Sequence, residues 1–318
     1  MDLRDKVLGD VDLDTARVLE VGPLHNPQLR KEEADVRYID IAGTDELRAK
    51  YADNPHVAPL VDRLVDVDYV LRPGQTLAEA TGDDAPFDLV IASHVIEHVA
   101  DPVGWLGQVW QVLAPGGALS LVIPDKRYCF DVNRQLTTMA DLVDAHLRRL
   151  TAPGFRQIYD HEANYAGDVD QRELWAGRDV SALRRRDVED PDAFAYAMCQ
   201  QIARTGEYRD VHSSTFTPES FLSLLDKVTL LGLTDFQLSR FYPTEPDDLQ
   251  FFVTLVRSAN HDDDTMQRRE RQRAAIAEVS HQVASQRGVR RVQVIKRRAV
   301  ARLRSLRARA RGVKADRG

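Results

Sequence analysis

Short apolar segments of strand length alternate with helix-length segments over the first 127 residues, and this alternation constrains the fold more than any other feature. Strand patterns stand at residues 18–21, 36–41, 64–71, 87–92 and 118–123. The segment 87–92, Phe-Asp-Leu-Val-Ile-Ala, is apolar on both faces, as strands of a covered parallel sheet usually are. Apolar residues at helical spacing lie between the strands, for example within residues 105–113. The sequence therefore predicts a doubly wound, mostly parallel α/β sheet.

The strand rhythm stops between residues 128 and 210, a charged and helix-prone stretch that we interpret as a helical insertion. Thr217 followed by Pro218 then predicts a helix start. Two closing strands are expected at residues 236–241 and 250–256. The predicted domain organisation has four parts. They are the first part of the α/β sheet at residues 1–127, the insertion at 128–210, a closing helix and strands at 211–260, and a tail at 261–318.

Charge is distributed unevenly along the chain. The formal net charge is −7, yet residues 268–318 hold 17 Lys and Arg against 3 Asp and Glu. An acidic body with a basic tail indicates two physical roles. Cys129 and Cys199 form no CxxC pair, which argues against a disulfide framework. Because no apolar run approaches the ~20 residues of a spanning helix and no apolar signal core is seen, we expect a cytoplasmic protein.

The tail contains a second periodic pattern, between residues 290 and 311. Its apolar residues recur at spacings of three and four, and they are Val292, Ile295, Ala299, Leu303, Leu306 and Ala310. The pattern predicts a basic amphipathic helix that contacts an anionic surface, here the inner face of the membrane. Nucleic acid is a less favoured partner. A solvated or disordered tail, or one folded back onto the acidic body, is an equally open interpretation.

Polar residues follow the first two predicted strands. Residues 20–27 read Glu-Val-Gly-Pro-Leu-His-Asn-Pro, where a tight turn before a helix start would make a place for a polar ligand. Gly22 allows close approach of the backbone, and the Glu20 carboxylate suits an ammonium group. Asp40, twenty residues on, can accept both hydroxyls of a ribose. An ordinary β–α turn with a surface Asp is the alternative interpretation.

A denser pattern follows the fourth predicted strand. Residues 87–99 read FDLVIASHVIEHV, and residues 112–117 read VLAPGG. In this order they resemble class I S-adenosylmethionine-dependent methyltransferases of the small-molecule branch, in which FDLV, EHV and VLxPGG mark strand four, the next helix and strand five. The resemblance covers residues 15–127, and residues 206–256 fit the family's last helix and antiparallel strands. It implies a Rossmann-like seven-stranded sheet with helices on both faces.

The resemblance also implies a function. The cofactor would be S-adenosyl-L-methionine, bound by residues 1–127, and the insertion would cap the acceptor side. The pattern is further similar to methyltransferases found beside glycosyltransferases in bacterial envelope-glycan pathways. We therefore expect O-methylation of a sugar or other small envelope metabolite, with a small-molecule or glycan acceptor.

The implied cofactor-binding residues lie at the strand ends. They are Glu20, Gly22, Leu24, Asn26, Asp40, Ile41, Ser93 and His94. In the family's pattern Glu20 meets the methionine amino group, Asp40 binds the ribose, Ile41 packs on the adenine, and Ser93 and His94 border the sulfonium.

Two departures from the family's pattern stand out. The glycine-rich loop keeps only Gly22, with Leu24 and Asn26 where further glycines are common. Asn tolerates a positive φ angle, so we expect the loop to survive the change. Residues 72–74, Arg-Pro-Gly, replace the usual acidic residue after strand three.

Methyl transfer to a hydroxyl benefits from a base with a pKa near neutral. The candidates are His94, His98, His212 and Asp125, and the sequence alone does not choose among them. His98 and His212 also fit buried structural roles. No metal site is expected. His94 and His98 stand at HxxxH spacing, but a metal role needs further ligands, and no CxxC pair supplies them.

Three other functions are compatible with parts of the sequence pattern. An NAD(P)-dependent oxidoreductase should show a GxGxxG motif, which the chain lacks. A nucleic-acid methyltransferase could use the basic tail, but the body is acidic and no Asn/Asp-Pro-Pro-aromatic motif follows strand four. A non-catalytic binding or scaffold protein on the same fold stays open, because the glycine loop is eroded.

Overall fold

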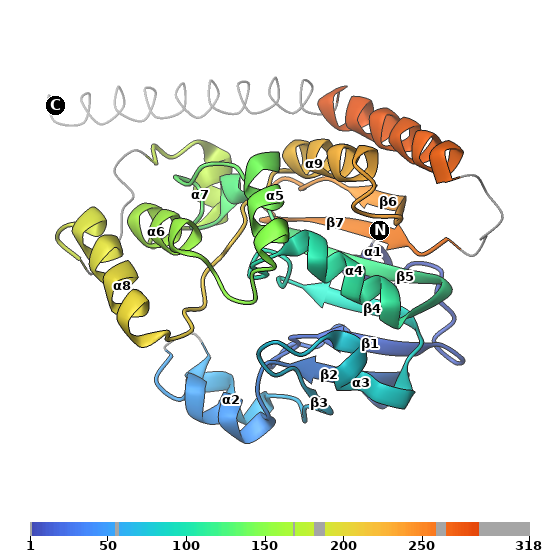
Figure 1. Ribbon diagram of the computed structural model, residues 1–318, viewed down its shortest axis with the longest axis horizontal. Helices are drawn as coiled ribbons and strands as arrows, with labels where there is room; N and C mark the ends of the chain where they lie inside the picture. Colours follow the sequence, from blue (N-terminus) through green and yellow to red (C-terminus); the bar gives the residue numbers. More distant parts are fainter. Residues whose placement is uncertain (1, 55–56, 168, 181–187, 259–264, 286–318) are drawn as a thin grey trace, which may run out of the picture.

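The structure is a computed structural model that describes residues 2–54, 57–167, 169–180, 188–258 and 265–285. Its centre is one seven-stranded sheet with the strand order β3-β2-β1-β4-β5-β7-β6 (Figure 1). The strands are β1 (Arg17–Val21), β2 (Asp35–Asp40), β3 (Tyr69–Val70), β4 (Phe87–Ser93), β5 (Leu113–Pro124), β6 (Gln237–Tyr242) and β7 (Gln250–Val256). Strands β1 to β5 run parallel, and β7 is antiparallel to both β5 and β6. The predicted fold class is confirmed.

Apolar side chains cover both faces of the sheet because neighbouring residues of a strand point to opposite sides. In β1, Leu19 belongs to one core cluster and Val18 to the other, and both are fully buried. The first face packs against α3 (Leu77–Thr81), α4 (Pro102–Val112) and α9 (Pro218–Leu230). The second packs against α1 (Leu3–Leu8). This two-sided burial explains why the strand segments are continuously apolar.

The connection from β1 to β2 differs from the expected strand–turn–helix. Residues 22–34, all of them described, form turns and contain no helix. Leu29 of this segment is fully buried in the second core cluster, so the segment itself covers the sheet where a helix was expected. Strand β3 is also shorter than the predicted 64–71. In this part of the chain, the first helix after β1 is therefore α2 (Thr44–Tyr51), which follows β2.

The insertion is helical, as expected. It contains α5 (Met139–Arg148), α6 (Phe155–Asn164), α7 (Gln171–Ala176) and α8 (Pro191–Thr205). Helix α6 packs against α8, and the chain that leaves α8 passes close to α2 before it reaches α9 (Figure 1). The described part also contains the short helices η1 (Ala58–Arg63), η2 (Gly82–Asp84) and η3 (Lys126–Tyr128). Helix α9 begins after the Thr217 cap, as predicted.

The predicted boundary at residue 260 needs correction. A helix at residues 265–285 crosses over α9 and β6 (Figure 1), and its Ile276 and Val283 are buried in the main core. Its Gln272 side-chain oxygen accepts a hydrogen bond from the Leu238 amide at 2.8 Å. The first half of the predicted tail therefore belongs to the folded body. The predicted amphipathic helix at 290–311 lies outside the described residues.

None of the helices in the described part of the chain has the length and apolar content that crossing a bilayer requires.

Candidate active site

The Glu20 carboxylate holds the loop that follows β1. One of its oxygens accepts a hydrogen bond from the Gln28 amide at 2.7 Å and the other from the Leu29 amide at 3.2 Å. The residue is 1% exposed. Burial raises the pKa of Glu20 to about 7, against the lowering effect of the two amides. Glu20 therefore faces its own loop, and the ammonium contact implied by the resemblance stays a prediction.

Two positions of this loop have a positive φ, Gly22 at 62° and Leu24 at 47°, and of the two only Leu24 carries a side chain that makes the angle strained. Asn26, which was expected to supply the tolerance of positive φ, does not have one. An added Cβ on Gly22 would lie 3.4 Å from Val95 Cγ2, an ordinary van der Waals contact, so the positive φ rather than a lack of space favours glycine here. The backbone of the loop therefore passes close to the end of β4, as a ligand site between these strand ends requires.

Asp40 and Ile41 lie at the end of β2 in positions that suit a nucleoside. One Asp40 oxygen accepts the Ile41 amide at 2.7 Å, and no hydrogen bond to the other oxygen is seen among the described residues. Burial raises the pKa of Asp40, with Asp210 acting in the same direction. Ile41 is 48% exposed, so its apolar side chain is open to a ligand. An open carboxylate oxygen beside an open apolar side chain fits a ribose and its base.

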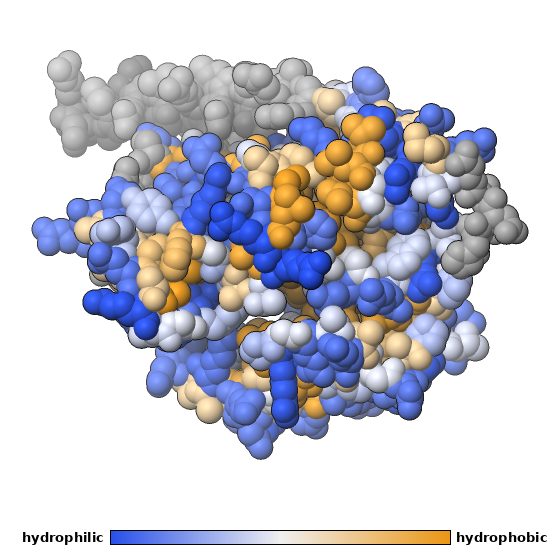
Figure 2. Space-filling view, viewed as in Figure 1, coloured by the Kyte–Doolittle hydropathy of each residue, from blue (hydrophilic) through white to orange (hydrophobic). Residues whose placement is uncertain are grey.

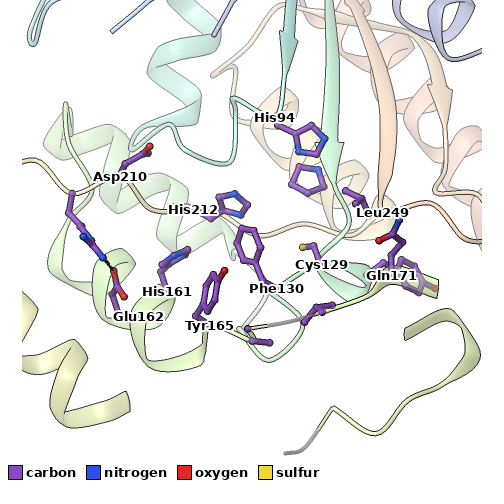
Figure 3. Close-up of a pocket in the computed structure, with 16 residues that line it drawn as sticks. His94, Cys129, Phe130, His161, Glu162, Tyr165, Gln171, Asp210, His212 and Leu249 are labelled. Atoms are coloured by element: carbon purple, nitrogen blue, oxygen red, sulfur yellow. Dashed lines mark hydrogen bonds and ion pairs between the residues drawn. The ribbon is translucent and has the colours of Figure 1, made fainter. Parts of the chain in front are cut away.

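A cavity of about 880 Å³ lies beside these strand ends, between the loop after β4 and the insertion (Figure 3). Its lining includes His94, Tyr128, His161, Tyr165 and His212. Figure 2 shows a hollow in the same face of the molecule, between α2 and the insertion helices. Asp210 also lines the cavity and interacts electrostatically with Asp40. The cavity and the nucleoside-like site are therefore adjacent.

His94 stands between the two sites, immediately after Ser93 at the end of β4. Its φ of 55° is a strained value for a residue with a side chain. Its Nε2 lies 2.8 Å from the Gln250 side-chain oxygen, and its Nδ1 lies 3.4 Å from a Glu97 oxygen. Burial disfavours the charged ring, but these two oxygens together hold the pKa of His94 above its ordinary value. Both nitrogens therefore face acceptors, which favours a positioning role over that of a base.

His98 and His212 are each held by an aspartate. His98 Nδ1 lies 2.9 Å from Asp210 Oδ1, and His212 Nδ1 lies 2.5 Å from Asp131 Oδ2. A carboxylate only accepts, so Nδ1 donates and the neutral ring carries its lone pair on Nε2. The two rings meet edge to face with centroids 4.6 Å apart. The fold thus brings together two candidates that the sequence separates by more than a hundred residues.

Asp125, the fourth catalytic candidate, is fully buried and does not line the cavity. Its carboxylate accepts hydrogen bonds from the Arg127 guanidinium at 2.6 to 3.1 Å and from Thr244 Oγ1 at 2.8 Å. The Asp125 amide also donates to Leu249 O at 2.7 Å. This placement favours a structural role, in which Asp125 ties the end of β5 to the segments beside it.

Sequence reasoning did not single out Glu97, Asp131, Asp210 or His161. Glu97 was visible in the EHV motif, but its burial was not. Asp131 and Asp210 lie in loops, and neither belongs to a sequence motif that would mark it as a site residue. His161 belongs to α6, where burial lowers its pKa to about 3. These residues become functional candidates only because the insertion folds back over the strand ends.

Parallel strands in the order 3-2-1-4-5, closed by an antiparallel pair, form the sheet of the class I S-adenosylmethionine-dependent methyltransferase fold. The model of a family described as "Methyltransferase domain" matches residues 2–168, and the chain belongs to that family. Its cofactor is S-adenosylmethionine, which supplies an activated methyl group on a sulfonium sulfur. Asp40, Ile41 and Gly22 fit this cofactor, whereas the Glu20 carboxylate is occupied by its loop.

Solved structures with the same kind of fold are distant. A methyltransferase from Methanosarcina mazei has 17% identity over 82% of this chain and 100% of its own, with a TM-score of 0.39. One from Mesorhizobium loti has 13% identity over 78% and 93%, with a TM-score of 0.38. The CurJ carbon methyltransferase has 15% identity over 79% of this chain, which spans about half (51%) of that structure, with a TM-score of 0.36. No curated protein sequence is significantly similar to the chain.

Proposed function

We propose that the protein transfers the methyl group of S-adenosylmethionine to a hydroxyl oxygen of a small polyhydroxylated acceptor, a sugar or related envelope metabolite. The acceptor binds in the cavity beside His94. Its oxygen forms a bond to the methyl carbon as the bond from sulfur to carbon breaks, the hydroxyl proton passes to solvent water, and S-adenosylhomocysteine is released. Because the methyl group is already activated, the main task of the protein is to hold the two reactants close and in line.

The lining of the cavity is the observation that carries this proposal. Tyr128, which lines the cavity, stacks on Trp175 with ring centroids 3.9 Å apart, so an aromatic surface lies on this side of the cavity. Arg209 donates two hydrogen bonds to Glu162, at 2.9 and 2.8 Å, on the opposite side. A sugar has apolar C–H faces and a rim of hydroxyl groups, so it needs both kinds of surface. A cavity of about 880 Å³ lies within the roughly 300–1,000 Å³ usual for small-ligand sites.

His94 borders both the cofactor side and the cavity, and we assign it contact with the acceptor. Its two nitrogens are held by Gln250 and Glu97, so the ring is fixed at the point where the acceptor oxygen meets the methyl group. The membrane or nucleic-acid contacts considered for the tail concern residues outside this site. An acidic body also makes nucleic acid a poor acceptor, because phosphates are bound by cationic surfaces.

The test is transfer of an isotopically labelled methyl group from the cofactor to a panel of nucleotide sugars, sugar phosphates and glycan fragments. Mass spectrometry should find an O-methylated product from at least one of them. Tyr128→Ala should lower kcat/KM for that acceptor while cofactor affinity changes little. Tyr159→Ala is the matched control, since Tyr159 belongs to the insertion but bonds to Asp192 outside the cavity. Cofactor binding without any methylated product would favour the non-catalytic alternative.

A further inference from the structure

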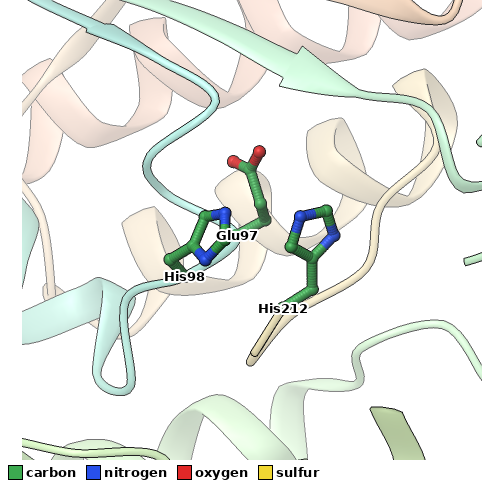
Figure 4. Close-up of side chains that lie close together, drawn as sticks. All are labelled: Glu97, His98 and His212. Carbon is green, nitrogen blue, oxygen red and sulfur yellow. The ribbon is translucent and has the colours of Figure 1, made fainter. Parts of the chain in front are cut away.

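We propose that Glu97, His98 and His212 form a binding site for one divalent transition-metal ion, Zn²⁺ foremost, at the wall of the cavity. One ligand atom of each residue lies within 4.8 Å of the others. Figure 4 shows the three side chains close together, with the Glu97 carboxylate on one side of the two rings. Glu97 and His98 follow β4, whereas His212 lies between α8 and α9.

Both histidines are oriented as metal ligands usually are. A ligating His commonly donates its other N–H to a carboxylate, which fixes the ring and its tautomer. Here Asp210 holds Nδ1 of His98 at 2.9 Å and Asp131 holds Nδ1 of His212 at 2.5 Å. In each ring, Nε2 is then the nitrogen whose lone pair can coordinate an ion. Asp131 is itself fixed by Arg134, whose guanidinium donates to it at 2.9 Å.

Glu97 has fewer hydrogen-bond partners than a buried carboxylate requires. It is 0% exposed, and among the described residues the His94 ring is its one side-chain hydrogen-bond partner, on Oε1, while Oε2 accepts no hydrogen bond. The nearest cation is the His94 ring, whose Nδ1 lies 3.4 Å from Oε1, a distance longer than a well-formed hydrogen bond. A buried charge without such partners is costly, whereas metal coordination would satisfy it. The competing interpretation is an internal ion pair of Glu97 with His94.

The donor set selects the kind of ion. Mg²⁺ and Ca²⁺ prefer sites made of oxygen atoms, whereas two imidazoles and one carboxylate suit Zn²⁺ and Fe²⁺. Zinc bonds of about 2.0–2.1 Å place neighbouring ligand atoms about 3.4 Å apart. The three side chains would therefore draw in by less than about an ångström each, a movement that side-chain rotation can supply.

Such an ion would have an open position toward the acceptor, because His212 lines the cavity. A bound ion polarises a hydroxyl oxygen and lowers its pKa, so the acceptor could lose its proton without a protein base. This role rests on the proposed function. The binding of the ion does not, and it can be measured with neither cofactor nor acceptor present.

The experiment uses the full chain, treated with a chelator and then titrated with Zn²⁺ by calorimetry and with Co²⁺ by visible absorption. We expect one ion per chain. Glu97→Gln and His212→Gln should weaken binding by more than about 100-fold, and Asp210→Asn by about 10–100-fold, the usual effect of losing an outer partner. His161→Gln is the matched control, because His161 lines the same cavity outside the three-residue cluster.

Absence of stoichiometric Zn²⁺ or Co²⁺ binding in the wild type would overturn the proposal, as would equal affinity in Glu97→Gln. Either result would leave the internal ion pair as the explanation. Circular dichroism checks that each variant folds. If Glu97→Gln does not fold, Asp210→Asn decides, since the Asp210 side chain is 36% exposed and its loss leaves the buried core intact. Metal binding without any methylated product would refute the proposed function alone.

Discussion

Glu20 offers a direct test of how the loop after β1 is held. Its carboxyl group is 1% exposed, and it binds the Gln28 and Leu29 amides. Burial raises its pKa from 4.5 to about 7. Between these two pH values the folded chain retains a proton that the unfolded chain has lost. The contribution of Glu20 to stability is therefore complete below pH 4.5 and is lost as the pH rises through about 7.

The magnitude follows from the shift. Each pKa unit corresponds to about 1.4 kcal/mol, so a rise from 4.5 to about 7 corresponds to about 3 kcal/mol. Glu20→Gln replaces the titrating group with a neutral one of the same shape. We expect the free energy of unfolding of the wild type to fall by about 3 kcal/mol more than that of the variant between about pH 4.5 and 8.

Urea unfolding of both proteins across this range is the measurement. Glu32→Gln is the matched control, because Glu32 is exposed on the same loop and its removal should leave the pH profile of the wild type unchanged. Parallel profiles for the wild type and Glu20→Gln would refute the reasoning. They would mean that the carboxylate is ionised in the folded chain, with its two amide bonds outweighing burial.

Three further predictions concern other parts of the molecule. Asp40→Ala should weaken S-adenosylmethionine binding by about 1–3 kcal/mol in calorimetry, because ribose hydroxyls lose a charged acceptor; undiminished affinity would remove the ribose assignment. Arg127→Met should cost about 3 kcal/mol in urea unfolding, since Asp125 is left buried without its cation; a loss below about 1 kcal/mol would contradict its structural role. Truncation after residue 260 should lower Tm, because burial of Ile276 and Val283 contributes about 1.5–3 kcal/mol each. Flotation of a protein truncated after residue 285 with anionic liposomes, compared with the full chain, tests the predicted membrane contact.

Much of the fold could be predicted because it depends on local patterns. Segments such as residues 87–92 are apolar on both faces, which indicates a covered parallel strand before any neighbour is known. The start of α9 at Pro218 follows from the Thr217 cap. Asp40 was found as a site candidate because the end of a strand can be located from periodicity alone. The prediction of a helix after β1 was wrong. Burial of Leu29 and the hydrogen bond from its amide to Glu20 hold that segment in a non-helical conformation.

The site itself depends on contacts between distant segments, which no local pattern contains. Glu97 and His98 could be read from one motif, but His212 joins them only when the insertion returns the chain across the strand ends. Asp125 has the same residue type and position as a catalytic acid would have, and only packing shows that Arg127 and Thr244 occupy it. Local sequence thus determined the sheet and the edge at which ligands bind, because periodicity and capping act within a few residues. The tertiary structure decided which polar groups meet at that edge, because burial and pairing depend on residues far apart in the chain.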